Sequence, residues 1–239
     1  MRSEHRTVHR VAAILEAVSR ATAPVGFSEL AEELQIPKST LHGFIKGLLA
    51  EGYLEAVGNS YSLGAGLHAI LGPADTSSRL LLDGLCEQIS ARTGETVTTA
   101  VPVASSVVYV FSAAASYEVC YMPRLRVRRP LLPTSSGKVF LAFADPQKRT
   151  EIYDDIDAHL VRAFEAERAE IERTGMAYNK GETVKDVGAV AVGAWINGHL
   201  SAAITVAGPI SRISDDLPYY GAVALEVVTA AGFGSLTEG

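Results

Sequence analysis

The strongest constraint on the fold of this chain is a change in the spacing of its apolar residues near residue 64. Before that point they recur every three or four positions, as on one face of a helix, whereas from residue 95 onward strand-like segments dominate. The 239 residues also exceed the usual length of one domain, about 100–150 residues. The sequence therefore predicts a domain at residues 1–63, a linker at 64–75 and a second domain at 76–239.

The first domain is predicted to contain three amphipathic helices and a hairpin. The first helix has an apolar stripe from Val8 to Val18 and ends before Ala23-Pro24-Val25-Gly26. Ser28 is the expected N-cap of the second helix, and Pro37 is expected in the first turn of the third. Strand-like pieces at 53–57 and 61–63 flank a turn at Gly58-Asn59-Ser60. This order of elements is typical of a winged helix-turn-helix.

The third helix has one apolar face and one polar face. Its polar face carries short hydroxyls, a histidine and two lysines, which suit close approach to DNA bases and contact with phosphates. The predicted DNA contacts are Lys38, Ser39, Thr40, His42, Gly43 and Lys46 on the helix, with Asn59 and Ser60 in the wing. A plain helical bundle with a solvated polar face is the alternative.

The charge of the whole chain argues mildly against a nucleic-acid binder, since 21 Lys and Arg face 27 Asp and Glu, a net charge of −6. Most of the excess acid lies outside the first domain, where six basic side chains face seven acidic ones. The balance predicts few phosphate contacts per subunit, so that double-stranded operator DNA would be held with the help of dimerisation.

The second domain is predicted to be an antiparallel sheet with helices at either end, which makes the whole chain α+β. The glycines of the 64–75 linker would allow the domains to reorient. The expected elements are helices at 78–92, 137–143, 147–154, 160–173 and about 215–231, and strands at 95–102, 107–113, 118–122, 188–196 and 200–206, with a tight turn at Asn197-Gly198.

Two cysteines, Cys86 and Cys120, are too few for a disulfide framework and have no metal-ligand spacing. No apolar run reaches the roughly 18–20 residues that span a bilayer, and the N-terminus lacks a signal-peptide core. We expect a cytoplasmic protein with no metal site, no cofactor and no membrane contact.

Several motifs together resemble the IclR family of bacterial transcriptional regulators, and they occur in the family's order along nearly the whole chain. The motifs are Ile36-Pro37-Lys38-Ser39-Thr40-Leu41-His42, Glu51-Gly52-Tyr53-Leu54, Tyr61-Ser62-Leu63-Gly64, Thr93-Gly94-Glu95-Thr96-Val97, Ser136-Gly137-Lys138-Val139-Phe140-Leu141-Ala142 and Gly208-Pro209-Ile210-Ser211-Arg212-Ile213. The resemblance implies a winged helix-turn-helix joined to a GAF/PAS-like effector domain, in homodimers or dimers of dimers on palindromic operators. Gly43 departs from the large, often basic residue that members usually carry at this position, and Gly47 follows one turn later.

The resemblance also implies a pocket for a small-molecule effector beside the helix that starts near Ser136. The positions that correspond to the family's pocket are Ser135, Ser136, Asn179, Ala189, Thr205 and Ala207. Asn179 stands where members that bind small keto-acids carry a carboxylate, Ala189 where Cys is frequent, and Ala207 where a hydroxyl occurs. The less polar set predicts a larger or more apolar effector, such as an aromatic acid.

Two other interpretations of the second domain remain open. Ser135 and Lys138 form a Ser-x-x-Lys pair, which would suit a serine-based enzyme, but the companion motifs of such enzymes are missing. The domain would otherwise be a GAF-like binding module beside a vestigial DNA domain. We expect a regulator that is not an enzyme.

Arginines alternate at Arg124, Arg126 and Arg128, with Arg129 beside them. In a strand, the first three would share one face. They are predicted to face solvent or another subunit, or else to grip an anionic effector.

Overall fold

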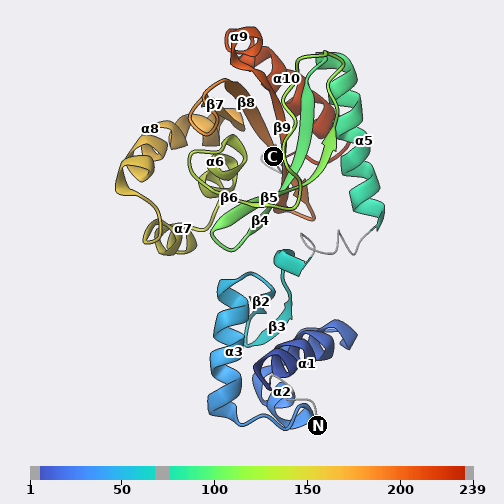
Figure 1. The fold of residues 1–239 in the computed structure, drawn as a ribbon, viewed down its shortest axis with the longest axis vertical. Helices are drawn as coiled ribbons and strands as arrows, with labels where there is room; N and C mark the ends of the chain where they lie inside the picture. Colours follow the sequence, from blue (N-terminus) through green and yellow to red (C-terminus); the bar gives the residue numbers. More distant parts are fainter. Residues whose placement is uncertain (1–5, 68–75, 235–239) are drawn as a thin grey trace. The chain divides into compact units, whose positions relative to one another are not determined.

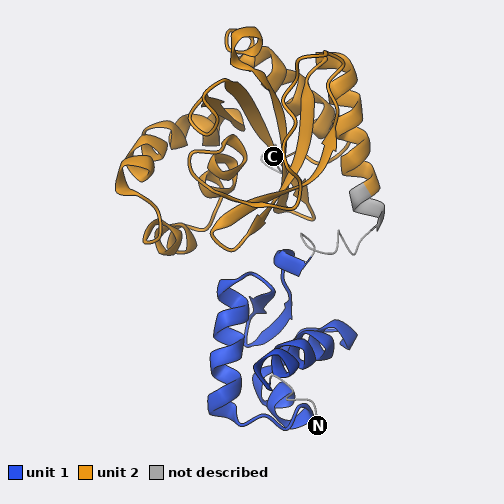
Figure 2. Cartoon of the chain, viewed as in Figure 1, with its two compact units in different colours: residues 1–72 blue, residues 73–239 orange. Residues whose placement is uncertain are grey.

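The computed structural model describes residues 6–67 and 76–234, and the chain forms two compact units, residues 1–72 and 73–239 (Figure 2). Each unit has its own hydrophobic core, so each is described separately. The predicted α+β class, with a winged helix-turn-helix before an antiparallel-sheet domain, is confirmed. Most of the linker predicted at 64–75 lies outside the described residues.

Among the described residues of unit 1, the helices α1, α2 and α3 pack with a small antiparallel sheet of strand order β1-β3-β2, and residues 65–67 form a further helical turn (Figure 1). Its core is formed where the apolar stripes of the helices meet the sheet, with Ile14, Leu30 and Leu41 fully buried. The elements are α1 (Arg6–Arg20), β1 (Val25–Gly26), α2 (Phe27–Glu33), α3 (Lys38–Ala50), β2 (Leu54–Val57) and β3 (Ser60–Leu63).

Three local predictions in unit 1 were wrong. Gly26, not Ser28, is the N-cap of α2, and the Glu29 carboxylate accepts a hydrogen bond from the Gly26 N–H at 3.3 Å. Ser60 begins β3 rather than closing the turn, because it pairs with Val57 and with Gly26. Pro37 precedes α3 as its N-cap rather than lying in its first turn. A two-residue strand is too short to have a sequence pattern, which is why β1 was missed.

Gly64 and Gly66 pack tightly within unit 1 instead of providing freedom of movement. A β-carbon on Gly64 would lie 2.3 Å from the Gly52 carbonyl oxygen, and one on Gly66 would lie 2.6 Å from it. The Gly66 N–H also donates to that same oxygen at 2.8 Å. These glycines are required by close backbone approach, so they do not act as hinges.

Unit 2 is built on a six-stranded sheet with the order β6-β5-β4-β9-β8-β7, in which every neighbouring pair is antiparallel (Figure 1). The strands are β4 (Thr96–Val103), β5 (Ser106–Ala113), β6 (Arg128–Pro130), β7 (Met176–Lys180), β8 (Val187–Ile196) and β9 (His199–Pro209). The helices are α5 (Thr76–Thr93), α6 (Ser135–Ala142), α7 (Pro146–Tyr153), α8 (Ala158–Thr174), α9 (Ile210–Ile213) and α10 (Leu217–Ala230).

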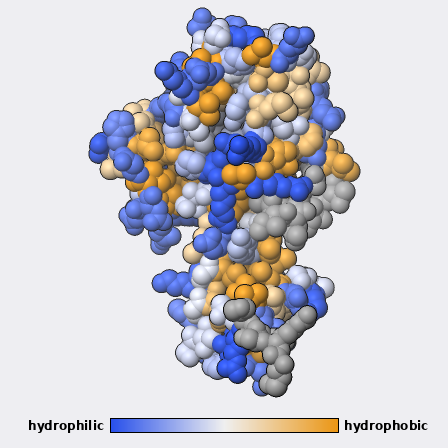
Figure 3. Space-filling view, viewed as in Figure 1, coloured by the Kyte–Doolittle hydropathy of each residue, from blue (hydrophilic) through white to orange (hydrophobic). Residues whose placement is uncertain are grey.

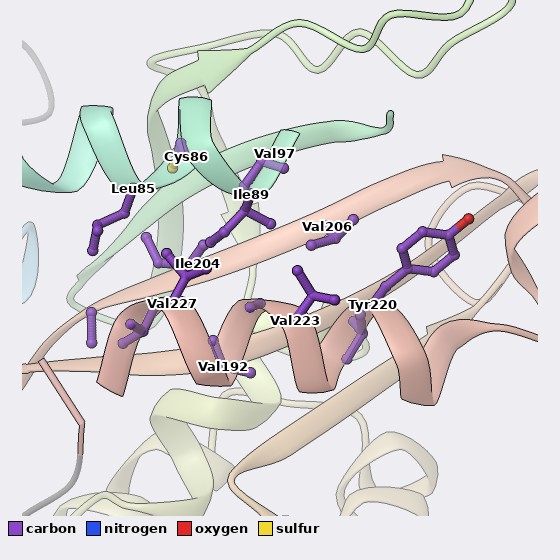
Figure 4. Close-up of a cluster of buried hydrophobic side chains, with 14 of the residues drawn as sticks. Leu85, Cys86, Ile89, Val97, Val192, Ile204, Val206, Tyr220, Val223 and Val227 are labelled. Carbon is purple, nitrogen blue, oxygen red and sulfur yellow. The ribbon is translucent and has the colours of Figure 1, made fainter. Parts of the chain in front are cut away.

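Successive residues of a strand point to opposite sides, so both faces of this sheet carry apolar side chains. Helices cover both faces and bury them. Figure 4 shows Val192, Ile204 and Val206 on the face that α5 and α10 cover, beside Val223 and Val227 of α10. The other face packs against α6 and α8, and its residues there include the small Ala177, Ala191 and Ala203. The sheet therefore separates two cores.

The strand predicted at 118–122 is wrong, and the arginine stripe lies outside a strand for most of its length. Residues 114–127 form an irregular segment, here called the strap, and Arg126 has a φ of +59°, in the left-handed region rather than the extended one. Only Arg128 and Arg129 belong to a strand, β6. In the strap, the Val119 and Tyr121 carbonyl oxygens accept hydrogen bonds from the Arg212 and Thr96 side chains, and the Arg126 N–H donates to the Tyr109 carbonyl oxygen of β5. Tertiary contacts therefore hold this segment in place of a regular strand ladder. β6, β7 and α9, which have three, five and four residues, were not predicted from the sequence.

Candidate functional site

The polar face of α3 is open to solvent in unit 1. Lys38, Ser39, His42, Gly43 and Lys46 are exposed. Thr40 is half-buried, because the helix turns its apolar face, with Leu41, Ile45 and Leu48, into the core. Apart from Thr40, the residues predicted to contact DNA on this helix thus form one exposed surface.

Two contacts fix α3 against α2, the first helix of the pair. The Lys38 ammonium donates to the Ser28 hydroxyl at 3.2 Å, so Ser28 joins the helices instead of capping one. The His42 ring meets the Phe27 ring edge-on, with 6.5 Å between centroids. These contacts set the direction in which the start of α3 points.

Gly43 and Gly47 have open space where a side chain would be, since no atom lies within 4 Å of a β-carbon built on either. Packing within unit 1 does not require glycine at these positions. Their effect is to leave the outer face of α3 flat, at a cost in helix stability of roughly 0.5–1 kcal/mol each.

The wing consists of β2, β3 and the turn between them. Gly58 has a φ of +60° in this turn, and Asn59 beside it is exposed. Ser60 is half-buried at the start of β3. The wing therefore offers Asn59 to a partner more openly than Ser60.

Unit 2 contains a small cavity between the sheet, the start of α6, the strap and the β7–β8 loop. Its walls combine hydroxyl groups, one amide, one guanidinium and small apolar side chains. The lining residues are Thr98, Tyr109, Tyr121, Arg129, Thr134, Ser135, Asn179, Thr183, Val184, Val187, Ala189, Thr205 and Ala207. Five of the six residues predicted from the resemblance line it, whereas Ser136 is buried outside the lining.

The floor of the cavity is the face of the sheet with small side chains. Ala189 of β8 pairs with Ala207 of β9, and Thr205 of β9 pairs with Thr98 of β4. Directly opposite residues of antiparallel strands point to the same side, so these four share one surface. Because these side chains end in methyl and hydroxyl groups, they leave space for a ligand, and larger side chains would fill that space.

The helix α6 approaches the sheet through a capped and very tight turn. The Thr134 hydroxyl accepts from the Gly137 N–H at 3.1 Å, and it donates to the Leu131 carbonyl oxygen at 2.7 Å. A β-carbon on Gly137 would lie 1.9 Å from that same oxygen, so only glycine fits. Ser135, in the first turn of α6 and 2% exposed, thereby reaches the cavity.

The Lys138 ammonium lies in a cluster of acceptors. Its ammonium donates to Glu167 at 3.0 Å, to Glu182 at 2.9 Å and to the Tyr178 carbonyl oxygen at 2.9 Å. These three hydrogen bonds commit the Lys138 N–H groups to Glu167, Glu182 and the Tyr178 carbonyl oxygen, and no hydrogen bond joins Lys138 to Ser135 among the described residues.

Asn179 uses its amide to hold the wall of the cavity. Its Nδ2 donates to the Pro133 carbonyl oxygen and to the Thr183 hydroxyl, both at 2.7 Å, and its Oδ1 accepts from the Glu182 N–H at 3.2 Å. It therefore fixes the β7–β8 loop against the start of α6.

A buried ion pair anchors the strap, which contributes Tyr121 to the cavity. The Arg212 guanidinium bonds both oxygens of the fully buried Glu95 carboxylate, donates to the Val119 carbonyl oxygen at 3.1 Å and stacks on Tyr117. A β-carbon on Gly208 would lie 2.3 Å from Glu95 Oε2. The Thr-Gly-Glu and Gly-Pro-x-x-Arg motifs thus meet in one structure that holds this wall.

Sequence reasoning missed Tyr109, Tyr121 and Thr98 as cavity residues, and it left Arg129 with two interpretations. Arg129 lies over the Tyr109 ring, with 4.8 Å from Cζ to the ring centroid. Burial raises the pKa of the Tyr109 hydroxyl, an effect that the nearby Ser136 hydroxyl and Arg129 charge reduce. Arg124, Arg126 and Arg128 are exposed and do not line the cavity. For the part of the cavity formed by Tyr109, Tyr121 and Arg129, the arginine-rich stretch was the only feature of the sequence that indicated a binding residue.

Within residues 6–67 and 76–234, no group of three or more His, Cys, Asp or Glu is placed to hold a metal ion. No helix in the same ranges is long and apolar enough to cross a bilayer. On the face in view in Figure 3, hydrophilic and hydrophobic residues are both present over each unit.

Family models match both units. The model for the IclR helix-turn-helix domain matches residues 7–58, and the model for the bacterial transcriptional regulator IclR C-terminal domain matches residues 79–231. A glycerol operon regulatory protein from Streptomyces griseus is 28% identical over 94% of this chain and 91% of its own length. The transcriptional repressor IclR of Escherichia coli is 24% identical over 89% of this chain and 84% of its own length.

Solved structures show the same fold. An IclR-family transcriptional regulator from Rhodococcus sp. has a TM-score of 0.60 at 24% identity, over 98% of this chain and 95% of that chain. An IclR homolog from Microbacterium hydrocarbonoxydans, complexed with 4-hydroxybenzoate, has a TM-score of 0.59 at 21% identity, over 94% of this chain and 97% of that chain. With its helix-turn-helix unit and its effector-binding type of C-terminal unit, this chain belongs to the IclR family of bacterial transcriptional regulators.

Proposed function

We propose that this protein binds a palindromic operator as a homodimer or dimer of dimers, and that an aromatic acid in the unit 2 cavity controls its affinity for that operator. The observation that carries the proposal is the cavity itself, lined by hydrogen-bond donors, two tyrosines and small apolar groups, with no carboxylate side chain among its lining residues. Effector binding shifts operator affinity by as much as the effector prefers one state over the other.

On the DNA side, we assign base contacts to Ser39, Thr40 and His42, and phosphate contacts to Lys38, Lys46 and the wing at Asn59 and Ser60. The exposure of α3 supports this assignment, since the N-terminal residues of a recognition helix meet base edges in the major groove. The flat surface at Gly43 supports a close approach of backbone to DNA.

The assignment of Lys46 is tested by the salt dependence of operator binding. Lys46→Ala is expected to weaken binding to all sequences and to lower the slope of log affinity against log salt by about 0.9 per subunit, as one lost phosphate contact predicts. Arg20→Ala is the control, because this substitution removes an equal charge from a side chain that is paired with Glu33 at 3.1 Å and is not among the predicted phosphate contacts. An unchanged slope would remove Lys46 from the contacts.

On the effector side, the less polar lining supports an aromatic acid rather than a small keto-acid. Ala189 and Ala207 contribute methyl groups, and Tyr109 and Tyr121 contribute rings against which an aromatic body packs. The complex of the Microbacterium relative with 4-hydroxybenzoate provides the first compound to test.

The test is fluorescence anisotropy of the full-length protein on DNA from upstream of its own gene, with and without 4-hydroxybenzoate, benzoate and phenylacetate. We expect specific binding that at least one acid changes severalfold. Absence of specific binding to this DNA would favour the GAF-like module with a vestigial DNA domain. Specific binding that no acid alters would contradict the aromatic-acid class.

We also propose that dimerisation supplies much of the operator affinity and that the chain performs no catalysis. Leu80 and Leu81 near the start of α5 are 64% and 58% exposed, an apolar area that a second copy would cover. The three hydrogen bonds that occupy Lys138 support the absence of a Ser135 nucleophile. We assign DNA binding to residues 1–63, the connection to 64–75, and effector binding with dimerisation to 76–239.

A further inference from the structure

The polar groups of the cavity fall into two classes, those already bonded within the protein and those left open. Thr134, Asn179 and Thr183 belong to the first class, because each is hydrogen-bonded to the loops around the cavity. Arg129 Nε and Thr205 Oγ1 belong to the second, since both atoms are buried and lack a hydrogen-bond partner in the described part of the chain. A buried donor without a partner costs free energy that a ligand can recover.

Arg129 is held so that its guanidinium faces the cavity. It pairs with Val107 of β5, so both side chains lie on the same face of the sheet, and Val107 is buried in the core beneath α6. The guanidinium stacks over the Tyr109 ring, and one terminal nitrogen donates weakly to the Arg124 carbonyl oxygen at 3.5 Å. The contact with the ring holds the guanidinium in place, and its Nε has no hydrogen-bond partner among the described residues.

The charge of Arg129 has no counterion among the described residues of unit 2. In the described ranges, no carboxylate forms an ion pair with it. Glu182, in the β7–β8 loop that borders the cavity, is bound to the Lys138 ammonium at 2.9 Å. A partly buried guanidinium beside an acid-free cavity is matched by an anion that brings two coplanar acceptors.

We propose that Arg129 binds the carboxylate of the effector through Nε and a terminal nitrogen, and thereby restricts the cavity to organic acids. The inference rests on the proposed function. It goes beyond it by assigning the recognition of the acid group to Arg129, at one end of the cavity. The ring of the acid then lies over the small floor at Ala189 and Ala207, and Thr205 Oγ1 is within the same lining to meet a polar substituent.

The experiment measures binding of acid and amide pairs to full-length protein by calorimetry: benzoate with benzamide, and 4-hydroxybenzoate with 4-hydroxybenzamide. The wild type is expected to prefer each acid by about 10- to 100-fold, as one charge-assisted bidentate contact allows. Arg129→Gln is expected to lose this preference while keeping weak binding of the amides. A purely structural role would weaken acid and amide equally.

Arg126→Gln is the matched control, because Arg126 lies in the same arginine-rich stretch, is exposed and lies outside the cavity lining. It is expected to keep the wild-type ratio of acid to amide affinity. If Arg129→Gln fails to fold, the test is an NMR titration of the wild type that follows the ¹H–¹⁵N signal of Arg129 Nε. This signal is assigned because it is lost in Arg129→Lys. That signal is expected to shift with the acid and not with the amide.

Each remaining outcome overturns the proposal. If Arg129→Gln keeps the preference for acids, another group, such as the start of α6, binds the carboxylate, and the proposed function stands without Arg129. If the wild type binds amides as tightly as acids, the cavity does not select anions. If neither compound class binds the wild type, the aromatic-acid function fails, and the role of Arg129 fails with it.

Discussion

The two faces of the six-stranded sheet come from the same strands and are built for opposite purposes. On the face that α5 and α10 cover, β8 and β9 contribute Val190, Val192, Ile204 and Val206, all fully buried. On the other face, the residues between them are alanines, a glycine and a threonine, and part of that face stays open as the cavity. We call these the closed face and the cavity face.

The alternation of side chains therefore separates stability from ligand binding within single strands. Large β-branched residues on the closed face bury apolar area, at about 25 cal/mol per Å². Small residues on the cavity face give up some of that contribution, because they let α6 approach and leave volume for an effector. Substitutions at adjacent positions of one strand should therefore have unlike effects.

The largest expected difference is between the reactivities of the two cysteines, because Cys86 of α5 is packed against the closed face. Burial raises the pKa of Cys86 to about 12, although the Thr99 hydroxyl at 3.2 Å opposes the shift in part. At pH 8 only about one Cys86 in ten thousand is then a thiolate, the form that reacts. We expect a thiol reagent to modify the half-buried Cys120 and to spare Cys86 until denaturant is added. Rapid modification of both would mean that the closed face opens in the native state.

The next effect is on stability and concerns Ile204, which is fully buried on the closed face. Ile204→Ala is expected to lower the free energy of unfolding of unit 2 by about 2–5 kcal/mol, through lost burial and an unfilled cavity. Urea denaturation followed by the fluorescence of Trp195, the single tryptophan, measures it. A loss below about 1 kcal/mol would show that the closed face tolerates voids.

A matched change on the cavity face is Ala207→Leu. The added atoms enter the cavity, so the free energy of unfolding should change by less than half as much as for Ile204→Ala. Effector binding should be lost, because the side chain fills ligand volume, while operator binding without effector is retained. Calorimetry and anisotropy measure the two properties. A destabilisation as large as that of Ile204→Ala would remove the distinction between the faces.

The smallest effect is expected for Thr205→Val, one residue along from Ile204 and on the cavity face. Valine keeps the shape of threonine and removes a buried hydroxyl that has no hydrogen-bond partner in the described part of the chain. The free energy of unfolding should be unchanged or rise by up to about 1 kcal/mol. A clear loss of stability in urea would mean that the hydroxyl is bonded in solution, for example through water.

The predicted part of the fold is the part that carries a long periodic pattern. The helices of unit 1 and the strands β8 and β9 have enough residues for apolar spacing to define them, and Asn197-Gly198 marks the turn between those strands, where both residues have a positive φ. The strap was misread as a strand, because Glu118–Met122 has strand-like residues but no neighbouring strand with which to pair. Its backbone is bound by Thr96 and Arg212 instead.

The candidate sites follow the same division. The exposed face of α3 could be read from the sequence, because helical spacing alone sets which residues share a face. The cavity could be read only where the resemblance supplied positions, and Tyr109, Tyr121 and Thr98 carry no motif of their own. For Arg129, the sequence showed a charged side chain in an arginine-rich stretch but not whether that side chain faces the cavity or solvent.

The two-part organisation and the helix-turn-helix could be predicted from the sequence alone, because apolar spacing and turn signals depend on neighbours a few positions apart. Only the tertiary structure decided that Lys138 is bound by Glu167 and Glu182, that Gly64 is fixed by Gly52, and that Arg129 alone of its stretch lines the cavity. Each of these depends on the packing of segments that are distant in the chain, and no local pattern encodes which distant group will lie opposite a side chain.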